Sequence, residues 1–285
     1  MLLSLIWGSS YILIKKGLVG LQPLQLGSLR ILFTFSILWV AGSRHLKTIP
    51  KDKWLWIAIS GYLGTFFPNF LFAYAETKID SAIAAVLNGL TPLFTLLLGV
   101  FFFGIALQRN KLLGVLMGLA GTLLLVFDQV QNTGIENGMY SLLVVIAAFC
   151  YAVNVNIIKY KIRGVSSMGI ALGNFMAIVP RAVFIFIYSD FIRLDFFNHR
   201  VYSSIGYVFI LAVVGTAMAK VIFNDLIAIA SPVFSSSITF LLPIVAIFWG
   251  VMDGEQLGWF HGVASVTILA GVYLVTDTKK TTSQD

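Results

Sequence analysis

The fold is decided by two hydrophobic stretches, NGLTPLFTLLLGVFFFG at Asn88–Gly104 and TFLLPIVAIFWGVMDGE at Thr239–Glu255. Each is long and apolar enough for a helix, and each carries a proline and, seven residues later, a glycine. Pro92 matches Pro243 at an offset of 151 residues, and Gly99 matches Gly250 at the same offset. A helix breaker at the same place in two apolar segments indicates an internal duplication.

The composition identifies lipid as the solvent of this chain. Hydrophobic residues make up 59% of the 285 residues and charged residues only 11%, with a mean hydropathy of +0.93. A soluble domain cannot bury this much hydrocarbon, whereas a helix of about 20 apolar residues crosses a bilayer. We therefore predict an all-α polytopic membrane protein with ten transmembrane helices. The expected spans are Met1–Ile14, Leu24–Gly42, Trp54–Ala75, Ile79–Gly104, Lys111–Phe127, Met139–Ile158, Ser167–Tyr188, Tyr202–Leu226, Ile229–Met252 and Leu257–Val275.

The first span is short. It either continues towards Leu21 with Lys15 and Lys16 snorkelling to the surface, or it is a signal peptide. No basic residue precedes its apolar run and no A-x-A site follows, which favours a retained helix.

The duplication predicts two inverted five-helix repeats, at residues 1–128 and 138–277. They are joined around Asp128–Gly138 (DQVQNTGIENG), which is expected to form an exposed polar turn. Because five is odd, the second copy enters the membrane from the opposite side. This architecture is common in secondary transporters, which bind substrate near the membrane midplane between the repeats and work by alternating access.

Lysine and arginine in the short loops predict that both termini are cytoplasmic. With this orientation the inner side carries Arg44, Lys47, Lys51, Lys53, Arg109, Lys111, Lys159, Lys161, Arg163, Lys279 and Lys280. The outer side carries Lys15, Lys16, Lys78, Arg193 and Arg200. The net charge of +7 is explained by this sidedness, so we expect no nucleic-acid partner.

Several motifs together resemble the EamA-type members of the drug/metabolite transporter superfamily. They are WGSSYILIKKGL (Trp7–Leu18), SLRILF (Ser28–Phe33), SAIAAVLNGLTPLFTLLLG (Ser81–Gly99), SPVFSSSITFLLPIVAIFWGVMDGEQL (Ser231–Leu257) and LAGVYLV (Leu269–Val275). The resemblance covers essentially the whole chain and implies a ten-helix transporter of the inner membrane. The first repeat departs from the pattern at Gly104, where the second repeat has Glu255.

The two prolines are predicted hinges. Pro92 removes a helical hydrogen bond to the carbonyl of Asn88, and Pro243 does the same at Thr239. A kink there frees backbone carbonyls and separates two half-helices. The alternative is that prolines are simply more frequent in transmembrane helices than in soluble ones.

Polar side chains within the spans predict a central binding site. Arg30, Arg181 and Lys220 lie away from helix ends, and such cations either face a cavity or snorkel to the headgroups. Arg30 also matches a recurring helix-2 arginine of the resembled family. Six asparagines are expected to point inward, either as interhelical hydrogen-bond partners or as cavity lining. The predicted substrate-binding residues are Trp7, Arg30, Asn69, Asn88, Tyr151, Asn154, Asn174, Lys220 and Asn224; Asn156 completes the asparagine set.

Buried cations favour a small-molecule substrate with an anionic group, such as an amino acid or an organic acid, moved outward. The resemblance disfavours cationic drugs, because helix 1 lacks the glutamate used by small multidrug exporters. An intramembrane enzyme or a membrane sensor is the alternative. However, no H-E-x-x-H motif, Ser–His pair or output domain is visible, and the three histidines lack ligand spacing. We expect neither cofactor nor metal. The Gly114/Gly118 and Gly258/Gly262 pairs permit close packing within a monomer or in a homodimer.

Overall fold

The computed structural model describes residues 1–104, 109–133, 135–255 and 258–276. These residues contain no strand and form ten helical segments, several of them interrupted. The segments are α1 (Leu2–Gly17), α2 (Pro23–Gly42), α3 and α4 (Trp54–Gly61 and Phe67–Ala75), α5 and α6 (Ser81–Asn88 and Thr91–Phe103), α7 (Arg109–Thr133), α8 (Ile135–Lys161), α9 (Ser167–Tyr188), α10 and α11 (His199–Ile210 and Ala219–Ile229), α12 and α13 (Pro232–Ser236 and Leu242–Met252), and α14 (Trp259–Thr276).

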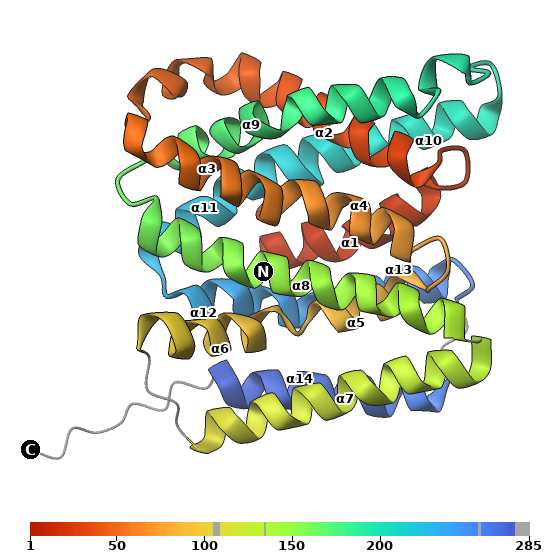
Figure 1. The fold of residues 1–285 in the computed structure, drawn as a ribbon. Coiled ribbons are helices and arrows are strands. Elements are labelled where there is room, and N and C mark those ends of the chain that lie inside the picture. The colour runs from red at the N-terminus through yellow and green to blue at the C-terminus, as the bar shows by residue number, and fades with distance from the viewer. Residues whose placement is uncertain (105–108, 134, 256–257, 277–285) are drawn as a thin grey trace, which may run out of the picture.

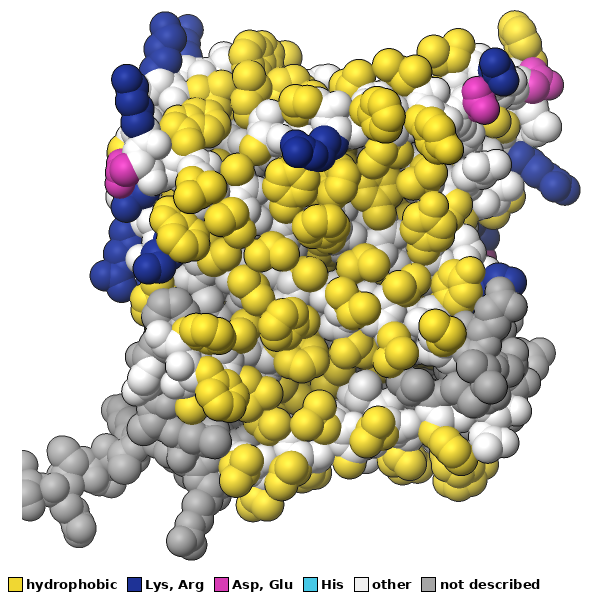
Figure 2. Space-filling view, in the orientation of Figure 1, with side chains coloured by type: hydrophobic (Ala, Val, Ile, Leu, Met, Phe, Trp, Pro, Cys, Tyr) yellow, Lys and Arg dark blue, Asp and Glu magenta, His cyan; other side chains and the backbone are white. Residues whose placement is uncertain are grey.

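The all-α polytopic fold is confirmed. Seven helical segments are long and apolar enough to cross a membrane, and shorter apolar helices occur at Leu112–Leu124 and Gly262–Leu274. α1 has 16 residues and continues past the predicted end to Gly17. On the face seen in Figure 2, apolar side chains cover most of the middle, and most lysines and arginines lie towards the two lateral edges. This distribution is that of a bundle surrounded by lipid.

Local chemistry fixes several helix ends. α2 begins with Pro23 in its first turn, and the Gln22 N–H donates to Gln25 Oε1 at 2.9 Å in a capping box. Ser166 caps α9 by accepting from the Gly169 N–H at 3.1 Å. α6 ends at Gly104, whose φ of 66° is open to glycine at little cost.

The packing has the exchange symmetry of two repeats. α2 lies against α9 at one side of the bundle, and α7 lies against α14 at the other (Figure 1). Each of these pairs joins corresponding helices of the two halves. α1 packs on α13, and the corresponding pair with the halves exchanged, α8 and α6, also packs together. With five segments in each half, this is the inverted arrangement predicted from the sequence.

The close approach of α7 and α14 depends on glycine. A Cβ at Gly271 would lie 2.5 Å from the Gly114 carbonyl oxygen and 2.6 Å from the Gly118 nitrogen. The first GxxxG pair therefore packs within the chain. A Cβ at Gly262 would meet nothing within 4 Å.

The structure differs from the prediction at the joint between the halves. α7 runs to Thr133 and α8 begins at Ile135, so most of the expected polar turn at Asp128–Gly138 is helical. The polar residues of this segment continue the two helices instead of ending them, because helices accept glutamine and glutamate readily. Residue 134 lies outside the described residues.

The two predicted kinks are breaks. α5 ends at Asn88, and Pro92 stands in the first turn of the separate half-helix α6. Pro243 stands in the first turn of α13, after a 3₁₀ segment at Ser237–Leu241. Each proline therefore lies between two half-helices, as predicted, but the regular helix is interrupted before the proline where a kink was expected. Proline favours the first turn because the N–H it lacks has no helical partner there.

Candidate functional site

A central cavity lies between the two halves, with about 1040 Å³ of space not filled by atoms when the part open to solvent is included. Helical segments from both halves line it, including α1, α2, α8 and α11. Eight of the nine predicted binding residues are among the lining residues: Trp7, Arg30, Asn69, Asn88, Tyr151, Asn154, Lys220 and Asn224. The polar and aromatic side chains predicted from the sequence therefore converge on one cavity.

Arg30 connects the two halves at the cavity wall. Its Nε donates to Thr216 Oγ1 at 2.8 Å and its Nη1 to Asn69 Oδ1 at 3.2 Å. Asn69 is itself held by a 2.7 Å bond from Nδ2 to the Gly27 carbonyl. Because a guanidinium has five N–H groups, donors remain for a ligand after these two bonds.

Lys220, on α11 of the second half, matches Asn69 at the offset of 151 and also lines the cavity. Its side chain is 9% exposed, and its Nζ donates to the Gly64 carbonyl at 3.2 Å and to Thr65 Oγ1. Its ammonium also lies 6.0 Å from the ring centroid of Phe175. Arg30 and Lys220 lie close enough to repel each other electrostatically. The two cations therefore raise the positive potential of one side of the cavity.

Both cations are held by π-helical turns. One turn, Tyr62–Phe66, separates α3 from α4, and the other, Leu211–Met218, separates α10 from α11. Lys220 of the second half binds the Gly64–Thr65 turn of the first half, and Arg30 of the first half binds Thr216 in the turn of the second. π-turns shift the backbone register and leave carbonyls unpaired, which is why they recur at functional sites.

Aromatic rings form the walls between the polar groups. Trp7 packs edge-on against Phe223 with centroids 4.9 Å apart, and its Nε1 donates to the Gly215 carbonyl at 3.0 Å. Phe72 stacks on Tyr151 with centroids 6.2 Å apart. These rings form the apolar part of the cavity wall.

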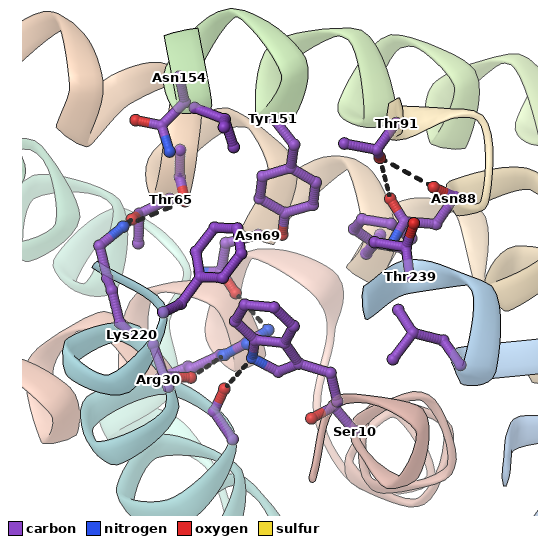
Figure 3. Close-up of a pocket in the computed structure, with 18 of the residues that line it drawn as sticks. Ser10, Arg30, Thr65, Asn69, Asn88, Thr91, Tyr151, Asn154, Lys220 and Thr239 are labelled. Atoms are coloured by element: carbon purple, nitrogen blue, oxygen red, sulfur yellow. Dashed lines mark hydrogen bonds between the residues drawn. The ribbon is translucent and has the colours of Figure 1, made fainter. Parts of the chain in front are cut away.

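Neutral polar groups lie opposite the cations. Asn88, Thr91 and Thr239 face the cavity from the side across from Arg30 and Lys220, with Tyr151 between (Figure 3). Asn88 Nδ2 donates to Tyr11 Oη at 2.8 Å, and Thr91 Oγ1 donates to the Asn88 carbonyl at 2.8 Å. The cavity therefore has one cationic side and one side of hydroxyls and amides.

Two further asparagines complete the lining. Asn154 Oδ1 accepts from Ser60 Oγ at 2.6 Å. Asn224 Nδ2 donates to the Ser167 carbonyl at 3.2 Å, and its Oδ1 has no hydrogen-bond partner among the described residues.

Three of the polar residues considered from the sequence lie elsewhere. Asn174 is 0% exposed and joins helices: with its amide assigned so that the nitrogen faces the acceptors, Nδ2 donates to the Ile57 and Ile170 carbonyls at 2.8 and 3.2 Å, and Oδ1 accepts from Ser60 Oγ at 3.3 Å. Asn156 Nδ2 donates to the Ala152 carbonyl at 2.9 Å and is likewise structural. Arg181 is exposed on the outer surface, 5.1 Å from the ring of Tyr62.

Several other residues line the cavity that were not predicted from the sequence. Most of them carry hydroxyls or are glycines: Ser10, Tyr11, Gly64, Thr65, Thr91, Gly215, Thr216 and Thr239. A signal for four of them was present. Gly64–Thr65 and Gly215–Thr216 are the same dipeptide at the offset of 151 that relates the two prolines. Serine and threonine are otherwise too common in helices to be singled out by type alone.

A second charged cluster joins α1 to the connection between α13 and α14. Lys15 Nζ lies 2.8 Å from Glu255 Oε1 and 3.2 Å from Asp253 Oδ2, and Lys16 also pairs with Asp253. Desolvation alone would raise the pKa of both carboxyls. Hydrogen bonds from the two lysines, and from Ser81 to Glu255, instead hold both pKa values below the usual 3.8 and 4.5.

Comparison with known proteins gives a consistent picture. The sequence pattern of the EamA-like transporter family matches residues 1–127 and 138–277. A protein of Salmonella typhimurium named "Probable amino-acid metabolite efflux pump" is 27% identical, covering 96% of this chain and 92% of its own length. An Escherichia coli protein named "Uncharacterized inner membrane transporter YedA" is 28% identical, covering 96% of this chain and 88% of its own. One solved structure shares the fold, with a TM-score of 0.64 at 19% identity and 96% of each chain covered.

Proposed function

Because this chain belongs to the EamA-like transporter family, we propose that it is an exporter of small amino acids or organic acids that carry a carboxylate. The relatives carry the names of transporters and efflux pumps, not of enzymes, and one name places its protein in the inner membrane. A multi-pass transporter of the inner membrane is therefore the premise, and the substrate class, the outward direction and the alternating-access mechanism are the proposal.

The positive charge of the cavity is the main support for a substrate with a carboxylate. Arg30 and Lys220 both reach it, and none of the described lining residues is acidic. Two like charges inside a membrane bundle are costly without a counter-charge. An ion pair at 4 Å is worth about 4 kcal/mol at an effective dielectric constant of 20, before desolvation reduces the net gain. A substrate carboxylate would supply this counter-charge.

The remaining walls suit an amino acid. With its carboxylate at the Arg30–Lys220 side, its ammonium would lie near the hydroxyl and amide oxygens of Asn88, Thr91 and Thr239. An apolar side chain would then contact the Trp7 and Tyr151 rings.

The breaks before Pro92 and Pro243 support alternating access. Both prolines begin half-helices whose preceding turns line the cavity, with Asn88 in one half and Thr239 in the other. Half-helices can rotate without breaking regular hydrogen bonds, and corresponding breaks in two inverted repeats allow the halves to exchange roles.

The experiment is a counterflow assay in proteoliposomes with labelled amino acids. Each amino acid is paired with its decarboxylated amine of the same side chain as competitor. We expect amino acids and organic acids to compete, and the amines to compete poorly. Arg30→Ala should abolish exchange, and Arg181→Ala, a cation outside the cavity, should leave it unchanged.

Equal competition by the amines would overturn the carboxylate requirement. Saturable binding of an amino acid without exchange would instead favour a membrane sensor. Comparing substrate release from inside-out and right-side-out vesicles would test the outward direction.

A further inference from the structure

Glu76 is a buried acid that takes no part in the proposed binding of the substrate. It directly follows α4, and its backbone N–H caps the helix by donating to the Phe72 carbonyl at 2.9 Å. Its side chain is 6% exposed. Neither carboxyl oxygen has a hydrogen-bond partner in the part of the chain that the structure describes.

An ionised carboxylate is poorly accommodated in this place. A buried charge without hydrogen bonds is among the most costly groups in a protein, and the group usually avoids the cost by becoming neutral. The C-terminal end of α4 adds a partial negative charge beside it. The protonated form of Glu76 therefore fits the conformation seen here.

The charges that act on Glu76 link it to both sites described above. Glu255 repels it, Arg30 and Lys15 attract it, and Tyr11 of the cavity wall also interacts with it. Charged groups of both the cavity and the Lys15–Glu255 cluster therefore act on the Glu76 carboxyl. Any movement that separates Lys15 from Glu255, or brings substrate to Arg30, changes the balance between the two forms of its carboxyl.

We propose that Glu76 is the proton-binding site that couples transport to a proton gradient. A proton from water adds to one carboxyl oxygen before the acid becomes buried, and it returns to water when a later conformation hydrates the same group. One proton moves per cycle and no other bond changes. This inference rests on the proposed transport function, but it concerns the driving force and not the substrate.

The test separates exchange from driven transport. Wild type, Glu76→Gln and Glu76→Asp are reconstituted, with Asp190→Asn as a matched control because Asp190 is an exposed acid paired with Arg193. Counterflow is measured at equal pH on both sides. Accumulation is then driven by an imposed pH gradient of either polarity, with and without a protonophore, and a trapped pH dye records proton movement.

We expect wild type and Asp190→Asn to accumulate substrate only under a gradient and to move protons with it. Glu76→Gln, which resembles the protonated acid, should keep counterflow but lose gradient-driven accumulation by roughly tenfold or more. Glu76→Asp should keep coupling with a shifted pH dependence. Wild type that exchanges but ignores the gradient, or Glu76→Gln that still couples, would overturn the proposal while leaving the transport function intact.

A substrate-independent readout decides the case in which none of the tested amino acids is exchanged. Infrared difference spectra between neutral and alkaline buffer report the carbonyl stretch of a protonated carboxyl. A band present in wild type and absent in Glu76→Gln would support the proton site even though the substrate class had failed. Absence of the band in wild type would refute it.

Discussion

Glu255 Oε1 accepts hydrogen bonds from Lys15 Nζ at 2.8 Å, from Ser81 Oγ at 2.6 Å and from the Ser81 N–H at 3.0 Å. Its second oxygen accepts from the Ala82 N–H at 3.2 Å. One carboxylate therefore caps the N-terminus of α5 and binds α1 to the connection after α13. The two repeats therefore use this position differently. In the second half Glu255 makes these contacts, whereas in the first half the matching residue, Gly104, takes a positive φ directly after α6.

Glu255→Ala should destabilise the protein markedly. It leaves two backbone N–H groups at the start of α5 without their acceptor, and each unsatisfied buried donor costs about 1–3 kcal/mol. Lys15 loses its acceptor as well but is partly exposed to water. The measurement is thermal unfolding in detergent. Asp190→Asn, which removes an exposed ion pair with Arg193 and keeps a side chain that tolerates the positive φ of this position, is the control and should shift stability by no more than about 1 kcal/mol. Similar losses in both variants would contradict the role of the cluster.

The same cluster predicts a direction for the pH dependence of stability. The pKa values of Asp253 and Glu255 are lowered by folding, so their contribution is complete above the unfolded values of 3.8 and 4.5. It is lost as the pH falls through the lower folded values. Melting temperatures from pH 7 to pH 3 should decrease at the acid end. Glu255→Gln should begin less stable and show a shallower decrease, and an unchanged slope would argue against this assignment.

Arg30→Lys should impair transport although the charge is kept. Arg30 reaches Thr216 with Nε and Asn69 with Nη1, and one lysine nitrogen cannot span both while also binding a carboxylate. Counterflow should fall roughly tenfold or more. Arg181→Lys on the outer surface is the matched control and should be neutral. Normal exchange by Arg30→Lys would mean that only the positive charge of Arg30 matters and not the geometry of its guanidinium.

Pro92→Ala and Pro243→Ala should slow transport more than they reduce expression or melting temperature. Alanine restores an N–H and allows the half-helices to merge across the break, which stiffens the proposed hinges. Pro180→Ala provides a control, because Pro180 lies inside the continuous helix α9. If transport and expression fall in parallel, the two prolines are structural only.

Cysteine labelling tests the predicted orientation. In a Cys150→Ser background, Lys51→Cys lies at the end of the bundle rich in lysine and arginine, and Phe197→Cys replaces a fully exposed side chain between α9 and α10. An impermeant maleimide should label Phe197→Cys in intact cells and Lys51→Cys only after the membrane is opened. The reverse pattern would invert the topology.

The membrane environment, the number of spans and the duplication follow from the amino-acid sequence, because each depends on hydrophobic length and on recurrence along the chain. Eight of the cavity residues also follow from the sequence, since a polar group such as Asn69 or Lys220 inside a span is costly unless it faces a partner or a cavity. Tertiary structure alone decided which polar groups converge. Asn174 and Arg181 look like Asn154 and Arg30 in sequence, yet one is packed between helices and the other faces outward. The rotation of each helix, set by π-turns, breaks and glycine contacts, makes that difference, and it also leaves Glu76 buried without a partner.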